Sequence, residues 1–517
     1  MGLLVGRPIP RRKEYSHWPV LPRNYTVHNV SQYGRMVGLR GIERGVDMEI
    51  KPGLNVGRTE TPTRNDFNSD VSLDVKWGVT PSLTSDFTLN TDFAQVENDS
   101  LEVNLTRFSL LYPEKREFFL ESPDLFQFGP QQAQVFFSRR IGIKDGREVP
   151  LLGGARFYGL AGDTNIGVLA MRTRTVDGID GENFVVTRMK QNLLDRSYIG
   201  GIFSSRSGVE GEEDRTFGLD ASYVFGSNST LFASVAKNER RPGVDSGEWF
   251  YHAFASYDTD LLSGRVAYMD IGQNYEPGIG FVPRPDQKNL SLSGSFNPRP
   301  SWELVRQMEL ALDYERIETH DKVVETQKGR FAITANFDTG DRLWFSSEAY
   351  GELIPAPFEI APDVFVAGGS YGFKQAEIGG SLYEARRFTG SLSFRWGGLY
   401  GGHLSAANAS LTWKPTSRLH LTMENLLNEV DLPDGRFQAN VHRLFASVFF
   451  GPDLSTRAAV QYSSLEQRLV LNFRLRWIYA PGSEAWFVYD EGNRFDIPGT
   501  SLQSRALIFK IVHSFNR

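Results

Sequence analysis

The sequence contains no cysteine, no long apolar run and no basic stripe, and each absence excludes a class of protein or site. Without cysteine there is no disulfide framework and no zinc site with cysteine ligands. No stretch approaches the roughly 20 consecutive apolar residues that a membrane helix needs, which excludes a helical membrane protein. The formal net charge of -6 comes without a basic stripe, so nucleic acid is not an expected partner.

Glycine and aromatic residues are abundant instead. The 517 residues include 50 Gly, 37 Phe and 19 Tyr. Aromatic side chains favour strands, and glycine favours the turns between them. The mean hydropathy of -0.33 does not argue against a membrane location, because a barrel strand is apolar only at every second position over about ten residues. The composition therefore favours an all-β protein with many turns.

Apolar and polar residues alternate along much of the chain, which is the pattern of strands with one apolar face. The clearest segments are residues 71–79, 217–225, 290–297, 308–315 and 469–477. Half-buried strands of a soluble, multi-sheet binding protein would alternate in the same way. The alternation predicts strands, and the turns must decide between the two architectures.

Several turns share one arrangement, in which an aromatic residue stands two positions before a proline. The aromatic residues are Phe296, Trp413, Phe450 and Tyr479. In a barrel this would place their rings at one rim, where the headgroup region accepts them. Short turns such as NPRPS and FGPDL also alternate with longer polar segments such as 272–288, as in barrels with short inner turns and long outer loops.

These observations predict a large antiparallel transmembrane β-barrel of roughly 22 to 26 strands in the bacterial outer membrane. We expect residues 34–517 to form the barrel and residues 1–33 to be a linker. The start of the chain places apolar residues before basic ones, the reverse of a signal peptide, so we expect that signal upstream. The segment RALIFKIVHSFNR reads as the closing strand. Outer-membrane lipid and the barrel-assembly machinery are the expected partners.

Residues 89–129, LNTDFAQVENDSLEVNLTRFSLLYPEKREFFLESPDLFQFG, resemble the core motif of the DUF5916 family. FFSRRIG at 136–142, GIGFVPR at 278–284 and RLRWIYAPGSEAWFVYD at 474–490 match as well. Members of this bacterial family usually carry a family-9-like carbohydrate-binding module ahead of a predicted outer-membrane barrel. The resemblance implies the barrel and its location, and it implies that the module is missing here. It implies no established activity.

A dense polar cluster marks the candidate site. Its charges cannot face lipid, so we expect them to line the lumen or a constriction. An equally simple interpretation is a salt-bridged network that braces the inner wall. The candidates are Asp92, Gln95, Glu97, Asp99, Arg107, Glu114, Lys115, Arg116, Glu117, Arg139, Arg140, Arg474 and Arg476. The stretch from about 92 to 129 mixes charge with aromatic residues, so it is predicted to fold inward and fill or gate the barrel.

Enzymatic and metal sites are weakly indicated. The carboxylates near residue 92 do not have the spacing of an EF-hand calcium loop. GGSYG at 368–372 fits the nucleophile motif of serine hydrolases with Ser370 as nucleophile, but a strand and a helix would have to flank it. No paired-histidine metal spacing and no phosphate-binding loop occurs. We therefore predict no catalytic residue, no metal and no cofactor.

The leading hypothesis is a non-enzymatic channel or surface-binding transport scaffold, associated with carbohydrate through the missing module. The alternative is a hydrolase embedded in the outer membrane that acts on lipid or glycan. That alternative needs a nucleophile, a base and an orienting group in one place, and the sequence shows no such convergence.

Overall fold

The structure is a computed structural model of the chain. It describes residues 2–9, 14–21, 27, 33–38, 47–91, 99–144, 147–176, 178–194, 196–208, 212–241, 248–495 and 502–516. Among these residues no helix is long and apolar enough to cross a membrane.

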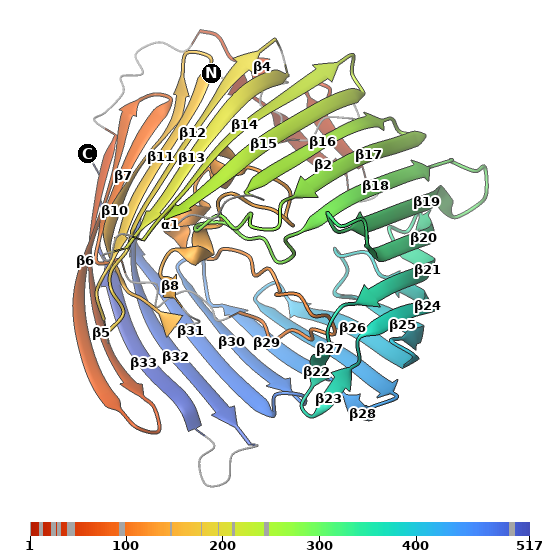
Figure 1. The fold of residues 1–517 in the computed structure, drawn as a ribbon. Coiled ribbons are helices and arrows are strands. Elements are labelled where there is room, and N and C mark those ends of the chain that lie inside the picture. The colour runs from red at the N-terminus through yellow and green to blue at the C-terminus, as the bar shows by residue number, and fades with distance from the viewer. Residues whose placement is uncertain are drawn as a thin grey trace.

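The described strands pair in chain order around one closed antiparallel ring of 24 strands (Figure 1). The first half of the ring comprises β5 (Met48–Glu60), β6 (Asn65–Thr80), β7 (Leu83–Leu89), β10 (Leu151–Ala161), β11 (Thr164–Thr173), β12 (Asn183–Leu193), β13 (Ser197–Ser207), β14 (Glu213–Phe225), β15 (Ser229–Arg241), β16 (Trp249–Asp258), β17 (Leu262–Ile271) and β18 (Gln287–Phe296). The second half comprises β19 (Val305–Glu318), β20 (Val324–Phe337), β21 (Arg342–Ile354), β24 (Gly369–Ser381), β25 (Phe388–Leu399), β26 (Gly402–Thr416), β27 (Leu419–Leu432), β29 (Val441–Phe449), β30 (Leu454–Ser463), β31 (Arg468–Ala480), β32 (Ser483–Arg494) and β33 (Leu502–Val512).

Two short strands extend the ring without adding a position to it. β28 (Gly435–Gln438) pairs with the end of β27, and β34 (Phe515–Asn516) follows β33 along β5. The ring closes where β33 pairs with β5. Closure leaves no unpaired sheet edge, which a bilayer requires. The predicted all-β barrel is confirmed, and its strand number lies inside the expected range.

The two rims of the barrel differ in the length of their connections. At one rim, which we call the short-turn rim, pairs such as β10–β11 and β31–β32 are joined by two residues. The other, the long-loop rim, carries residues 90–150, 272–286 and 355–368. The aromatic residues predicted to share a rim do so: Phe296, Trp413 and Phe450 precede turns of the short-turn rim and are about half exposed.

The apolar residues of the alternating strands face outward. Leu219, Leu392 and Trp477 have exposed fractions of 64%, 63% and 53%. A soluble protein rarely exposes so large an apolar surface, and hydrocarbon is the environment that such a surface matches. Two stacked sheets would have buried these side chains, so the interpretation as a soluble multi-sheet protein is wrong. The chain is a large outer-membrane β-barrel.

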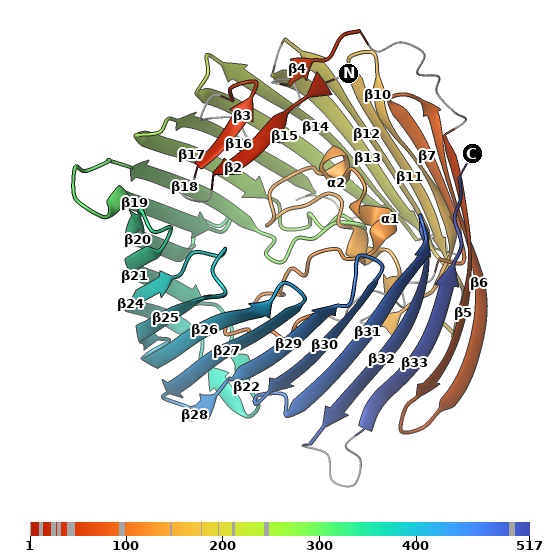
Figure 2. The same cartoon turned by 180° about the vertical axis from the view of Figure 1, so that it is seen from behind.

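A long excursion of the chain lies inside the ring. β7 and β10 are direct neighbours, with Leu89 opposite Gly153, so residues 90–150 leave and rejoin the barrel at one place on the long-loop rim. We call residues 99–144 the inner segment. It contains α1 (Glu117–Leu120), α2 (Pro123–Phe126), the 3-10 helix η2 (Ser138–Arg140) and β8 (Ile143–Lys144), which pairs with β9 (Arg147–Glu148). Figures 1 and 2 show the helices enclosed by the strands.

Smaller elements complete the described chain. A hairpin of β22 (Phe358–Ala361) and β23 (Val364–Val366) packs with the ends of β25 to β28 in a second apolar cluster. Near the N-terminus, β2 (Val5–Ile9) pairs with β3 (Glu14–Trp18), and β1 (Gly2–Leu3) pairs with β4 (Gly34–Arg35) (Figure 2). The barrel strands begin at Met48.

Candidate functional site: the inner segment and the lumen

The C-terminal half of the inner segment is attached to the barrel wall by apolar packing. Its buried residues, such as Phe119, Phe126 and Phe128, form one cluster with buried lumen-facing residues of strands β10 to β17. Lumen walls of barrels are ordinarily polar. Here the wall is apolar where the inner segment covers it.

Two glycines make room for the phenylalanine rings. A Cβ atom at Gly167 of β11 would lie 2.9 Å from the ring of Phe126, and one at Gly218 of β14 would lie 2.6 Å from the ring of Phe128. Such distances leave no space for a side chain. The wall is therefore hollowed at these two positions, and the rings fill the hollows.

A charged latch stands beside this apolar contact. Glu121, at the end of α1, accepts hydrogen bonds from Lys76 of β6 and Tyr158 of β10. Arg156 of β10 is 2% exposed, donates to the backbone oxygen of Glu121 at 2.8 Å and contacts Asp86 at 2.9 Å. Burial works against ionisation of Glu121, but the bonds from Lys76 and Tyr158 hold the pKa of its carboxyl below its usual range.

A second group of polar contacts, which we call the knot, holds the inner segment in shape. The guanidinium of Arg116 contacts Glu114 at 2.7 Å and donates to the backbone oxygens of Ser138 and Ile141 at 2.7 and 2.8 Å. The hydroxyl of Ser138 donates to Glu114 at 2.6 Å. Burial alone would raise the pKa of Glu114, but these donors lower it. The knot ties the coil before α1 to η2.

The N-terminal half of the inner segment reaches other parts of the wall by polar contacts and by packing of Leu101 and Val103 against Val441 and Val470. The backbone N–H of Leu101 donates to Gln461 of β30 at 3.1 Å. Arg443 of β29 donates to the backbone oxygen of Leu101 and contacts Glu102. These strands lie across the ring from the β10 to β17 wall.

A third attachment lies on β20. Arg107 of the inner segment contacts Glu325 at 3.0 Å, and Arg284 of the loop 272–286 contacts the same carboxylate at 2.7 Å. The ring of Phe108 lies between the two guanidinium groups, at 4.9 and 5.2 Å from them. The inner segment is thus fixed to three parts of the wall.

The loop 272–286 clasps the inner segment from the long-loop rim. Gln134 and Phe281 exchange backbone hydrogen bonds of 3.0 Å, and the N–H of Phe137 donates to Ile279 at 2.7 Å. The loop is anchored in turn by His320, whose Nδ1 and Nε2 lie 2.7 and 2.8 Å from carboxylate oxygens of Asp286 and Asp270. The motif at 278–284 therefore serves the clasp.

The predicted lumen residues separate into groups. Asp92, Gln95 and Glu97 lie outside the described residues. Asp99 contacts Lys115 at 3.3 Å and Arg139 at 3.2 Å, so the structure brings these three together. Arg140 donates to the backbone oxygen of Gly280 at 3.1 Å. Arg474 and Arg476 lie on β31 and contact Asp490 and Glu484 of β32. The others are Arg107, Glu114 and Arg116, which make the contacts described above, and Glu117, which opens α1.

Sequence reasoning missed Glu325, Arg443 and Arg457, which meet the inner segment or the cavity beside it. The alternating pattern shows only that such residues lie on the polar face of a strand, and it does not show what they contact. Nothing local indicates that Arg443 contacts Leu101, because 342 positions of sequence separate them.

The hydrolase motif does not form its expected structure. Ser370 lies in β24 and pairs with Leu353 of the neighbouring antiparallel strand, with no helix after it. The preceding Gly369 has a φ of 151°, a conformation that glycine accepts readily. The glycine-rich stretch is part of a strand. Within the described ranges, no three His, Asp or Glu side chains are grouped as a metal site would require.

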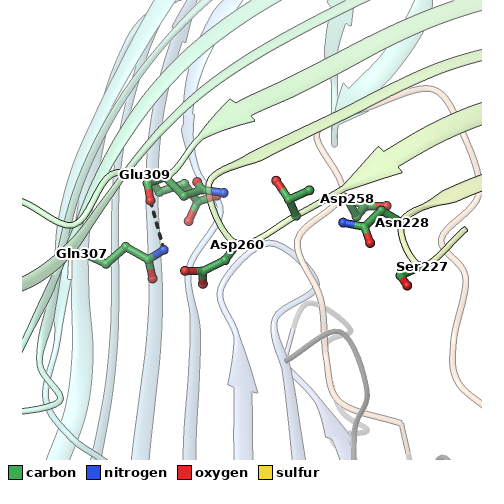
Figure 3. A pocket seen from close by; sticks show the side chains of 8 residues that line it. Ser227, Asn228, Asp258, Asp260, Gln307 and Glu309 are labelled. Atoms are coloured by element: carbon green, nitrogen blue, oxygen red, sulfur yellow. Dashed lines mark hydrogen bonds between the residues drawn. The ribbon is translucent and has the colours of Figure 1, made fainter. Parts of the chain in front are cut away.

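A polar pocket of about 530 Å³ opens beside the short-turn rim (Figure 3). Gln307 donates to the backbone oxygen of Asn297 at 3.3 Å, and Asp260 contacts Arg299 of the adjacent turn at 2.8 Å. The described residues that line the pocket are Ser227, Asn228, Asp258, Thr259, Asp260, Asn297, Gln307 and Glu309. Three of them carry a carboxylate and none is a cation.

Comparison with known proteins gives likeness of fold and one family match. No curated protein sequence matches the chain. The siderophore receptor PirA from Pseudomonas aeruginosa is 7% identical with a TM-score of 0.47, over 92% of this chain and 81% of that chain. PirA from Acinetobacter baumannii is 7% identical with a TM-score of 0.49, over 92% and 81%. The FrpB iron transporter from Neisseria meningitidis (F3-3 variant) is 9% identical with a TM-score of 0.42, over 92% and 82%.

The family match covers the first barrel strands and the inner segment. Residues 49–150, which include β5 to β7 and the inner segment, match the model of DUF5916, a domain of unknown function, and this confirms the resemblance over that part of the chain.

Proposed function

We propose that this protein is an outer-membrane channel for solutes whose inner segment forms the constriction. The observation that carries the proposal is the attachment of residues 99–144 to three parts of the lumen wall: the apolar side of β10 to β17, Glu325 on β20, and the side chains of Arg443 and Gln461 on β29 and β30. A barrel of this size encloses a wide lumen. A segment fixed across it narrows the path for solutes.

The apolar contact favours a constriction that stays in place. It argues against a plug that leaves the barrel. Departure of the inner segment would expose Phe184, Phe250 and other buried wall residues to water inside the lumen. Each large apolar side chain costs about 1.5 to 3 kcal/mol on exposure. The C-terminal half of the segment therefore stays docked while solutes pass.

The N-terminal half is held by fewer apolar contacts than the C-terminal half. Leu101 and Val103 pack with Val441 and Val470, and Leu105 packs against the apolar cluster around β22 and β23. Ion pairs and hydrogen bonds to β20, β29 and β30 add to this packing. A solute that competes for Glu325 or Arg443 would therefore loosen residues 99–107 before it loosened the C-terminal half, which is the behaviour of an adjustable constriction.

The rims suggest an orientation in the membrane. Outer-membrane barrels ordinarily turn their short connections toward the periplasm. The barrel strands begin at Met48 and end at β34 on the short-turn rim. We infer that this rim is periplasmic. The expected association with carbohydrate rests only on the module that proteins with this motif usually carry.

The enzyme alternative has weaker support. Ser370 stands in a strand with Leu353 opposite it, away from the strand–turn–helix geometry that activates such a serine. Loss of an esterase or glycosidase activity in a Ser370→Ala variant would favour that alternative.

Conductance tests the channel. The barrel refolded in detergent and inserted into a planar bilayer should give discrete single-channel steps. A second barrel in which an Asn-Gly turn replaces residues 90–152 keeps the β7–β10 pairing, and its steps should be several times larger. Conductance steps of equal size in the two barrels would contradict the constriction. If the wild-type barrel gives no current although its heat-modifiable migration shows that it is folded, the channel proposal is contradicted.

A further inference from the structure

A polar cavity opens at the long-loop rim, between the loop 272–286 and the wall strands β13 to β15. Its volume is about 220 Å³, which is enough for several water molecules or for a solute of a few heavy atoms. Arg140 of the inner segment contributes to it, together with three residues of the loop and residues at the ends of the strands. The described residues that line it are Arg140, Arg206, Glu212, Glu213, Asp214, Arg240, Glu276, Pro277 and Gly278.

Three of the charged residues form a row across the wall. Arg206 of β13 is directly opposite Asp214 of β14, and Asp214 is directly opposite Arg240 of β15. Asp214 is 7% exposed and accepts bonds of 2.8 Å from the backbone N–H of Gly278 and from the side chain of Asn238. The cation that contacts it is Arg240, at 3.3 Å. The carboxylate of Asp214 is therefore already engaged, and it holds Arg206 in no ion pair.

Two further residues of the lining have partners of their own. Arg240 donates to the carboxylate of Glu276 at 2.7 Å, and Arg215 donates to Glu213 at 2.8 Å. These pairs are complete without a solute.

Two guanidinium groups of the lining are only partly engaged. The Nε of Arg140 donates to the backbone oxygen of Gly280 at 3.1 Å, and no described carboxylate forms an ion pair with this residue. Arg206 has one ion pair, with Glu182 at 3.9 Å, and Lys144 contacts the same carboxylate at the shorter distance of 3.3 Å. Guanidinium groups in this condition can still donate parallel N–H bonds to a carboxylate.

A carboxylate of the lining also remains for a solute. Glu212 is exposed, stands directly before β14 and forms no ion pair with a described residue. A carboxylate only accepts hydrogen bonds, and an ammonium group donates three. The cavity thus offers donors for a carboxylate and an acceptor for an ammonium group to the same solute.

We propose that this cavity binds the zwitterionic head of a free amino acid. Arg140 and Arg206 are the ligands of its carboxylate, and Glu212 accepts from its ammonium group. The small volume favours a solute whose two charges are close together. The assignment rests on the proposed function and deepens it, because it makes amino acids the class of solute that the channel recognises. A bound amino acid would also link Arg140 of the inner segment to Arg206 of the wall.

Calorimetric titration of the detergent-folded barrel with glycine tests the site without any current. The wild type should bind glycine, and it should bind acetate, which carries the carboxylate alone, at least tenfold more weakly. Arg140→Gln and Glu212→Gln should each lower the affinity for glycine at least tenfold. Arg215→Gln is the matched control, because Arg215 follows Asp214 in β14 but does not line the cavity. The control should keep the wild-type affinity.

Acetate separates a ligand role of Glu212 from a structural one. In Glu212→Gln the preference for glycine over acetate should disappear, because the ammonium group has lost its acceptor while the carboxylate has kept its ligands. If the substitution only deformed the cavity, the affinities for both probes would fall by the same factor, and this result would contradict the assignment.

Absence of glycine binding in the wild type, or equal affinity for glycine in all four proteins, would overturn the assignment. Arg140 and Glu212 lie outside the barrel strands, so both variants should fold, as heat-modifiable migration can show. If one of them does not fold, the other decides. Conductance judges the channel separately, so a barrel that conducts but binds no glycine contradicts the amino-acid site alone.

Discussion

At the scale of single residues, the interior of this barrel is organised by side chains that meet across long stretches of sequence. Glu121 illustrates the principle, since its partners Lys76 and Tyr158 come from two different wall strands. Each contact is polar and close to lumen water. Such contacts set the position of the inner segment more than they set the stability of the barrel.

Neutralising Glu121 should loosen α1. In Glu121→Gln the ion pair with Lys76 is lost, and we expect local opening of α1 to become easier by about 1 kcal/mol, because the carboxylate is 37% exposed and screened. Hydrogen exchange of the amides of residues 117–121 measures this change. Glu117→Gln, on the same helix, is the control, and equal exchange in both variants would contradict the latch.

The knot at Glu114 predicts a dependence on pH. A glutamate in an unfolded chain titrates at a pKa of about 4.3. Because the pKa of Glu114 is lowered in the folded protein, its stabilisation is complete above that value and declines as pH falls through the folded pKa. The urea midpoint of the wild type should fall more steeply below pH about 4.3 than that of Glu114→Gln. An exposed-turn variant, Glu303→Gln, should follow the wild type.

At the scale of elements, the two halves of the inner segment are held to different degrees. Residues 118–141 pack into a large apolar cluster of the wall, whereas residues 99–107 combine polar contacts with two smaller apolar ones, through Leu101 and Val103 and through Leu105. The short helices α1 and α2 have four residues each, too few to be stable alone. Their conformation therefore depends on the wall that they contact.

Filling the hollow at Gly167 should displace α2. A side chain there would meet the ring of Phe126 at 2.9 Å, so Gly167→Val forces the ring out of its site. We expect a larger single-channel conductance and faster exchange in residues 123–128. Gly294→Val is the control, because a Cβ there has only a backbone oxygen at 3.5 Å nearby, an ordinary contact distance. Unchanged conductance in Gly167→Val would show that α2 is not part of the constriction.

At the scale of the whole molecule, the apolar exterior predicts where charge is tolerated. Leu392, in β25, is 63% exposed on the outer face. In Leu392→Arg the guanidinium meets hydrocarbon, and unfolding in lipid vesicles should become easier by about 2 to 4 kcal/mol if the site is near the midplane.

The control for this change lies in a turn. Leu304 is 65% exposed between β18 and β19 on the short-turn rim, so Leu304→Arg should leave the unfolding free energy within about 0.5 kcal/mol of the wild type. A small effect at Leu392 would mean that β25 does not face lipid.

The sequence by itself determined the barrel. Alternation in segments such as 217–225 and 469–477 indicated strands with one apolar face, and the aromatic residues before the turn prolines indicated a shared rim. These signals are local, because side-chain direction in a strand changes with every residue. The mixture of charged and aromatic residues from about 92 to 129 predicted a segment that folds inward.

Only the tertiary structure decided what the inner segment contacts. The apolar lumen wall of β10 to β17 is indistinguishable in sequence from other apolar strand faces, since its distinction comes from the neighbour that covers it. The pairing of Arg107 with Glu325, and of Leu101 with Arg443, joins positions 218 and 342 residues apart. Closure of the ring brings such positions together, and no pattern within a strand records which ones meet.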